Sequence, residues 1–192
     1  MKRRERKVKN IALLILYLSS PLGSQLGFAQ EEMPEMPKPT EQHEWLQKLV
    51  GEWTTATEIY LPGGEIMNTT GTESVRSIGG FWVVNEGDSS GMGLEFNSIL
   101  TIGYSPDKGH FIGTWIDSLN PDPFLYTGSL DSNKKTLTLE TEGPCPMKDD
   151  AITKFKEVIE FESPDHRVFT SYYEGDAGEW IKGLVTHSRR AK

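Results

Sequence analysis

About ten short segments in which apolar and polar residues alternate follow one another along this 192-residue chain. Alternation with a period of two is typical of half-buried strands, and strands at such regular spacing favour a barrel or a sandwich. No helical pattern separates the segments, which argues against a parallel sheet. We therefore predict an all-β fold, a single antiparallel up-and-down β-barrel of about ten strands. The predicted strands are Trp53–Tyr60, Ile66–Arg76, Phe81–Asp88, Phe96–Tyr104, His110–Asp117, Phe124–Leu130, Thr136–Glu142, Ile152–Phe161, Arg167–Glu174 and Trp180–Ser188.

The clearest hairpin runs from Gly103 to Ser118. Between its strands, Pro106 fixes φ and Gly109 can adopt positive φ, which is the chemistry of a tight turn. Successive residues of the second strand point to opposite faces of the sheet. One face therefore presents Phe111, Gly113, Trp115 and Asp117, and the other presents His110, Ile112, Thr114 and Ile116.

A single short helix is predicted before the first strand. Thr40 is a favourable N-cap, and Gly51 provides a C-terminal stop. Between them, four apolar residues fall on one helical face, so the helix is expected to pack on the barrel. These residues are Trp45, Leu46, Leu49 and Val50.

Residues 1–29 have the features of a signal peptide. Six Lys and Arg residues precede the short apolar run Ile11–Leu18, and Gly27-Phe28-Ala29 offers a cleavage site before Gln30. We predict an exported protein, periplasmic or secreted, with no stable membrane insertion after cleavage; a retained anchor is the alternative. Residues 30–39 are predicted to form a flexible, proline-rich linker, and residues 40–190 the barrel domain.

The charge of the chain excludes some classes of partner. Removing residues 1–29 takes away six of the 20 basic and one of the 28 acidic residues, which leaves a net charge of −13. Such a surface repels nucleic acid and anionic lipid. Cys145 is the only cysteine, so no disulfide can form within one chain.

Several blocks of the sequence match a known family. They are the segment His43–Trp53 with its Gly-Glu-Trp ending, Gly79-Gly80-Phe81 with Glu86, and Gly103-Tyr104 continuing through Gly113–Ser118. With Gly128-x-x-Asp131 and a last strand ending in Arg189, they resemble the domain of unknown function 1579 family of exported bacterial proteins. The resemblance covers about Pro39 to Arg190 and implies a barrel, but no established activity.

Gly51-x-Trp53 also resembles the opening of lipocalin and calycin barrels. In those folds the tryptophan plugs one end and an arginine of the last strand stacks across it. The resemblance implies that Gly51, Trp53 and Arg189 close the barrel, with Arg76 as the alternative arginine.

Motifs for covalent or metal chemistry are weak. Gly87–Gly91 matches Gly-x-Ser-x-Gly, but the predicted strand that follows cannot form a nucleophile elbow, which needs a helix there. Met33 and Met36 with His43 are too few for a specific copper site, and His110, His166 and His187 are scattered singly. No cofactor or metal is predicted.

A ten-stranded barrel can enclose a small ligand. The candidate lining residues are aromatic side chains with polar groups, together with one carboxylate: Trp82, Tyr104, Trp115, Tyr126 and Asp117. Asp117 shares a face with Trp115, so it either enters the interior or ends its strand by binding the following loop.

We therefore hypothesise that the protein binds a small, largely apolar molecule in the cell envelope, and no reaction is implied. One alternative is a hydrolase or isomerase in which Asp117 works with a nearby Tyr or His as an acid–base pair. The other is a structural envelope protein with a solidly filled barrel.

Overall fold

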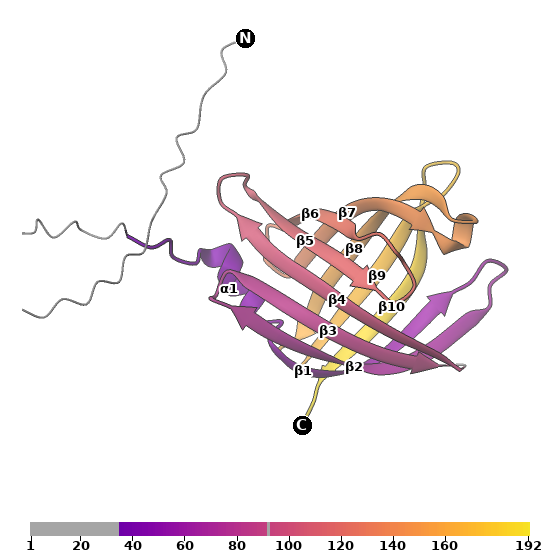
Figure 1. The fold of residues 1–192 in the computed structure, drawn as a ribbon, viewed down its shortest axis with the longest axis horizontal. Helices are drawn as coiled ribbons and strands as arrows, with labels where there is room; N and C mark the ends of the chain where they lie inside the picture. Colours follow the sequence, from indigo (N-terminus) through magenta and orange to yellow (C-terminus); the bar gives the residue numbers. More distant parts are fainter. Residues whose placement is uncertain (1–34, 92) are drawn as a thin grey trace, which may run out of the picture. The chain divides into compact units, whose positions relative to one another are not determined.

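The computed structural model describes residues 35–91 and 93–192. They form ten antiparallel strands that close into one barrel, in which each strand pairs with the next and β1 pairs with β10 (Figure 1). The predicted all-β, up-and-down barrel is thus confirmed. The strands are β1 Gly51–Tyr60, β2 Ile66–Ile78, β3 Trp82–Gly91, β4 Leu94–Ser105, β5 His110–Asp117, β6 Phe124–Leu130, β7 Thr136–Cys145, β8 Ala151–Ser163, β9 His166–Glu174 and β10 Trp180–Arg190.

The predicted signal peptide lies outside the described residues, so it stays a prediction. The same holds for the first half of the predicted linker, residues 30–34. No helix in the described part of the chain is long and apolar enough to span a membrane.

The α-helix of the described residues, α1 (Glu41–Gln47), is shorter than predicted. Gly51 does not stop it, because the helix ends four residues earlier and Gly51 is already the first residue of β1. β7 is longer than predicted and passes through Pro144 to Cys145. Its pairing with β6 ends at Glu140, so Pro144 has a sheet partner on one side only, where a missing N–H is tolerated.

Helix α1 covers one end of the barrel (Figure 1). The side chains of Trp45, Leu46 and Leu49 are almost fully buried against inward-facing strand residues. The Trp45 indole N–H also donates to the Lys134 carbonyl at 2.9 Å, which joins the helix to the β6–β7 turn. The buried core lies largely at this end. It consists of Trp45, Leu46, Leu49, Trp53, Val75, Val83, Leu100, Ile102, Phe111, Tyr126, Leu137, Leu139 and Ile159.

His43 connects the start of α1 to the sheet. Its Nδ1 accepts the Thr40 backbone N–H at 2.9 Å, so the ring proton resides on Nε2, which donates to the Tyr104 carbonyl at 3.1 Å. Both ring nitrogens are therefore occupied in a side chain that is 2% exposed. The role of His43 is to fix the helix on the barrel.

Candidate functional site

The covered end is closed by a tryptophan between two arginines. The Trp53 ring is 1% exposed, and the guanidinium carbons of Arg190 and Arg167 lie 4.2 and 4.8 Å from its centroid. The Arg190 Nη1 also donates to the Val50 carbonyl at 2.9 Å. Gly51 has φ of +132°, and a Cβ there would lie 2.5 Å from Arg190 Nη1. Glycine at this position leaves room for the guanidinium.

The prediction that Arg189 makes this contact is wrong by one residue. It pairs with Thr54 on the outer face, whereas Arg190 pairs with Trp53. A register shift between Lys182 and Leu184 changes the phase of alternation in β10. Beyond such a bulge, the residues that an unbroken alternation places outside point inward.

An ion pair lies just inside the closure. Arg167 Nη2 contacts Glu73 Oε2, and the Ser188 hydroxyl donates to the same oxygen at 3.1 Å. Arg167 and Ser188 are 4% and 1% exposed. This ion pair links β9 to β2, and Glu73 neutralises the charge of the inward-facing Arg167.

The half of the barrel remote from α1 is less filled. Here many inward-facing side chains are partly exposed, although alternation places them inside a closed barrel. We call these partly exposed, inward-facing residues the walls of the cup. They are Thr55, Thr57, Ile59, Met67, Thr69, Ser89, Phe96, Ser98, Phe155, Ser171, Leu184 and Thr186.

Glu157 lies between the cup and the filled half. It pairs with Ser171 of β9 and Leu139 of β7, and it is 5% exposed. The Ser171 hydroxyl donates to Oε1 at 3.1 Å, while Oε2 has no partner among the described residues. Burial raises the pKa of this carboxyl to about 8, and the Ser171 hydrogen bond opposes the shift. Glu157 is therefore mostly protonated at neutral pH.

Two further polar groups adjoin Glu157. The Thr141 hydroxyl on β7 is buried without a hydrogen-bond partner among the described residues. The pKa of Tyr126 is raised well above its usual value, chiefly by burial and then by the charges of Glu157 and Asp117. Buried polar groups are normally hydrogen-bonded, so unpaired ones at the floor of a cup indicate where a ligand or water completes the set.

Asp117 combines both of the predicted placements. It shares the inward-facing side of β5 with Trp115, whose indole N–H donates to Oδ2 at 2.6 Å. Its Oδ1 accepts the backbone N–H groups of Leu119 and Asn120, each at 2.8 Å. The carboxylate thus ends the strand and holds the following loop.

The remaining predicted lining residues lie in different parts of the barrel. Tyr126 faces the interior, but Tyr104 belongs to the filled end, where its ring meets Phe111 edge-on at 5.1 Å. Trp82 is on the outside, 37% exposed, with its ring over Gly103. Its prediction as a lining residue is wrong, because Val83 is the residue that alternation turns inward.

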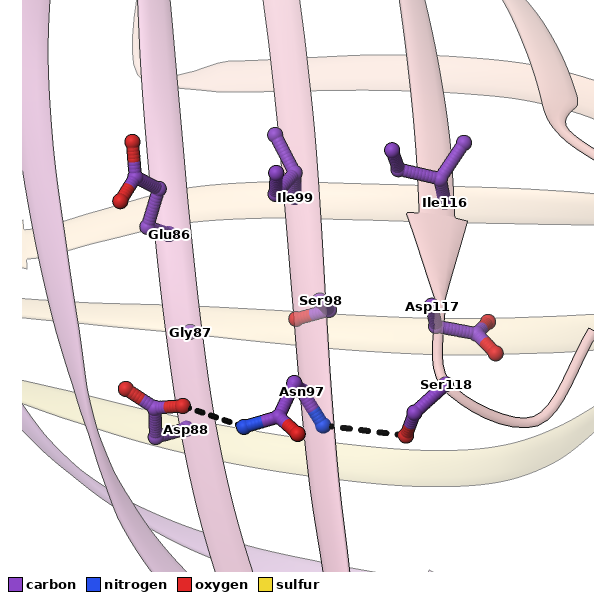
Figure 2. Close-up of a pocket in the computed structure, with 9 residues that line it drawn as sticks. All are labelled: Glu86, Gly87, Asp88, Asn97, Ser98, Ile99, Ile116, Asp117 and Ser118. Atoms are coloured by element: carbon purple, nitrogen blue, oxygen red, sulfur yellow. Dashed lines mark hydrogen bonds between the residues drawn. The ribbon is translucent and has the colours of Figure 1, made fainter.

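A separate groove of about 350 Å³ lies on the wall made by β3, β4 and β5. Figure 2 shows two hydrogen bonds here: the Asn97 side-chain amide donates to Asp88, and the Asn97 backbone N–H donates to the Ser118 hydroxyl. The Asp117 carboxylate points away from the Asp88–Asn97 pair. Outward-facing residues make up most of this groove, so it is distinct from the cup.

The sequence patterns did not single out Glu157, Ser171, Arg167 and Glu73. An acidic residue within an inward-facing alternation, as at Phe155-x-Glu157-x-Ile159, was the available signal. It was obscured because the outer face of β8 also carries apolar residues. No group of three or more His, Cys, Asp or Glu side chains within residues 35–91 and 93–192 is placed to hold a metal ion.

A model of a protein family described as "Protein of unknown function (DUF1579)" matches residues 38–190. This match spans nearly all of the described barrel. The chain belongs to the DUF1579 family. No curated protein matches the sequence significantly.

Two solved structures share the fold of the DUF1579 barrel. The S-type phycobiliprotein lyase CPES from Guillardia theta is similar with a TM-score of 0.54 at 14% identity, covering 80% of this chain and 94% of that one. Rv2717c from M. tuberculosis is similar with a TM-score of 0.57 at 10% identity, covering 81% of this chain and 100% of that one. At these identities the similarity extends to the fold alone.

Proposed function

We propose that this DUF1579 protein is exported and binds a small, largely apolar molecule in its cup. The observation that carries the proposal is the partial exposure of inward-facing side chains in the half of the barrel remote from α1. Barrels of this size commonly hold one small ligand in such a position.

The chemistry of the walls supports an apolar ligand with a few polar groups. Large apolar side chains alternate with hydroxyl groups around the cup. The Thr57 and Thr186 hydroxyls, for example, bond to each other at 2.8 Å. A ligand that buries an apolar body against such walls gains about 25 cal/mol for each Å² of apolar surface. The apolar members are Ile59, Met67, Phe96, Phe155 and Leu184.

The two alternatives receive less support. An acid–base reaction at Asp117 needs a free carboxylate, and both of its oxygens already accept hydrogen bonds from Trp115 and Asn120. A solidly filled barrel is at odds with the partial exposure of the cup walls.

Binding is tested with Nile red, an uncharged dye whose emission shifts to the blue in apolar surroundings. Wild type is compared with Thr57→Phe, which fills the cup, and with Ala56→Phe, which adds the same ring to the outer face of β1. We expect one saturable site in wild type and in Ala56→Phe, and affinity weaker by about tenfold or more in Thr57→Phe, since overfilling a binding space excludes its ligand. Equal binding by all three proteins contradicts the proposal.

Export is tested separately by fractionating bacterial cells that express the full chain. The expected mass in the periplasmic fraction is that of Gln30–Lys192, because the predicted cleavage site precedes Gln30. An uncleaved chain that stays in the cytosol would refute export without affecting the binding proposal.

A further inference from the structure

Among the described residues, no cationic side chain pairs with the carboxyl at the floor of the cup. Glu157 receives one hydrogen bond, from Ser171, and its Oε2 is unpaired among the described residues. The inward-facing Arg167 is engaged with Glu73 and stacks on Trp53. The ionisable side chains that face this part of the interior are Asp117 of β5, Tyr126 of β6 and Tyr173 of β9.

Aromatic side chains lie on the same inward-facing side of the sheet as this carboxyl. Phe155 precedes it on the inward face of β8 and pairs with Tyr173 across the strands. The Phe124 ring meets the Phe155 ring edge-on, with centroids 5.8 Å apart. Aromatic faces attract a cation electrostatically, and the attraction strengthens when water is excluded.

Among the described residues, the interior offers a ligand no unpaired cation. Arg167 neutralises Glu73 and Arg190 pairs with Asp165, while Glu157 is mostly protonated until a cation binds. The whole chain is also acidic, with a formal net charge of −8. An acidic protein with a carboxyl inside an aromatic-lined space raises the local concentration of cations at that space.

We propose that the molecule bound in the cup is a small apolar amine in its protonated form, whose ammonium group donates to the Glu157 carboxylate. This inference rests on the proposed function, since it specifies the ligand class for the same cup. On binding, the proton of the Glu157 carboxyl passes to solvent and the ammonium N–H groups occupy the two carboxylate oxygens. Binding thus replaces a neutral carboxyl, which has one hydrogen bond, by an ammonium–carboxylate pair with charge-assisted hydrogen bonds.

The test uses three probes of one shape: phenylbutylamine, phenylbutanol and phenylbutyric acid. Each is titrated by calorimetry at pH 8 into wild type, Glu157→Gln and Glu160→Gln. Glutamine matches the protonated carboxyl in size and is neutral, so Glu157→Gln keeps the fold. Glu160 is an exposed carboxylate on the outer face of β8, which makes it the matched control.

We expect wild type and Glu160→Gln to bind the amine about tenfold or more tightly than the alcohol, and the acid most weakly. Glu157→Gln should lose this preference and bind amine and alcohol alike. If wild type binds the alcohol as tightly as the amine, the amine inference fails while the binding cup stands. If none of the three probes binds, both the inference and the proposed function fail.

Proton release gives an independent readout. At pH 7 the Glu157 carboxyl is mostly protonated, because its pKa is about 8. Amine binding at that pH should therefore release close to one proton, measured as a difference in binding enthalpy between phosphate and Tris buffers. A neutral ligand that accepts a hydrogen bond from the carboxyl releases none. Amine binding without proton release contradicts the ammonium–carboxylate pair.

Discussion

At the scale of single residues, Glu157 couples the fold to pH. Its pKa is 4.5 in an unfolded chain and about 8 in the barrel, so the folded state retains a proton that the unfolded state has lost across this range. Because the unfolded state binds fewer protons here, the free energy of unfolding falls as pH rises from about 4.5 to about 8.

Replacing Glu157 by Gln removes this pH dependence. Relative to wild type, Glu157→Gln should gain stability between pH 5 and pH 8, by at most about 1.4 kcal/mol per pH unit. Urea unfolding of both proteins at pH 5, 6.5 and 8 measures the difference, and titrating groups that the two share cancel. A stability difference that stays constant with pH would show that Glu157 has an ordinary pKa in the folded protein.

Gly51 is a second residue with a specific role. Its φ of +132° is strained for any side chain, and a Cβ would also displace the Arg190 guanidinium. We predict that Gly51→Ala lowers the free energy of unfolding by about 1–3 kcal/mol or more. Gly63→Ala is the matched control, since Gly63 has φ of +96° with nothing within 4 Å of the added Cβ. If both variants lost the same free energy of unfolding, the displacement of Arg190 would contribute nothing to the effect of Gly51→Ala.

At the scale of elements, β10 and α1 meet at the closed end through Arg190. Its guanidinium covers Trp53, donates to the carbonyls of Lys48 and Val50, and pairs with Asp165 at 3.2 Å. One side chain thus holds the last strand to the α1–β1 connection and to the β8–β9 turn.

Arg190→Ala should therefore destabilise the barrel by about 1–3 kcal/mol, the sum of a partly exposed cation–π contact and several hydrogen bonds. Arg189→Ala should change stability by no more than about 0.5 kcal/mol, because that side chain is exposed. Chemical denaturation of the two variants measures both values. Comparable effects of the two substitutions would disprove the assignment of Arg190 as the closing arginine.

The elements were largely predictable, because alternation and turn residues determine where strands begin and end. β5 and β6 have the predicted bounds. The direction of individual side chains was harder to predict, since one bulge in β10 exchanges the inner and outer faces for the residues that follow. Arg189 was predicted from the resemblance, which does not locate this bulge, and the structure places Arg190 on Trp53.

At the scale of the whole molecule, the barrel divides into a filled half beneath α1 and a cup. Sequence patterns predicted the barrel, but the division follows from packing between strands far apart in the chain. Glu157 was not predicted, because both faces of β8 carry apolar and charged residues. A period of two alone does not reveal which face of such a strand turns inward.

The most direct test of the account is native mass spectrometry of the intact protein, purified without denaturation and then incubated with phenylbutylamine. We predict one bound molecule per chain in wild type and in Ala56→Phe, released by collisional activation, and none in Thr57→Phe, in which the cup is filled. Unliganded protein in every sample, or equal binding by wild type and Thr57→Phe, would contradict the claim that the cup is a ligand-binding site.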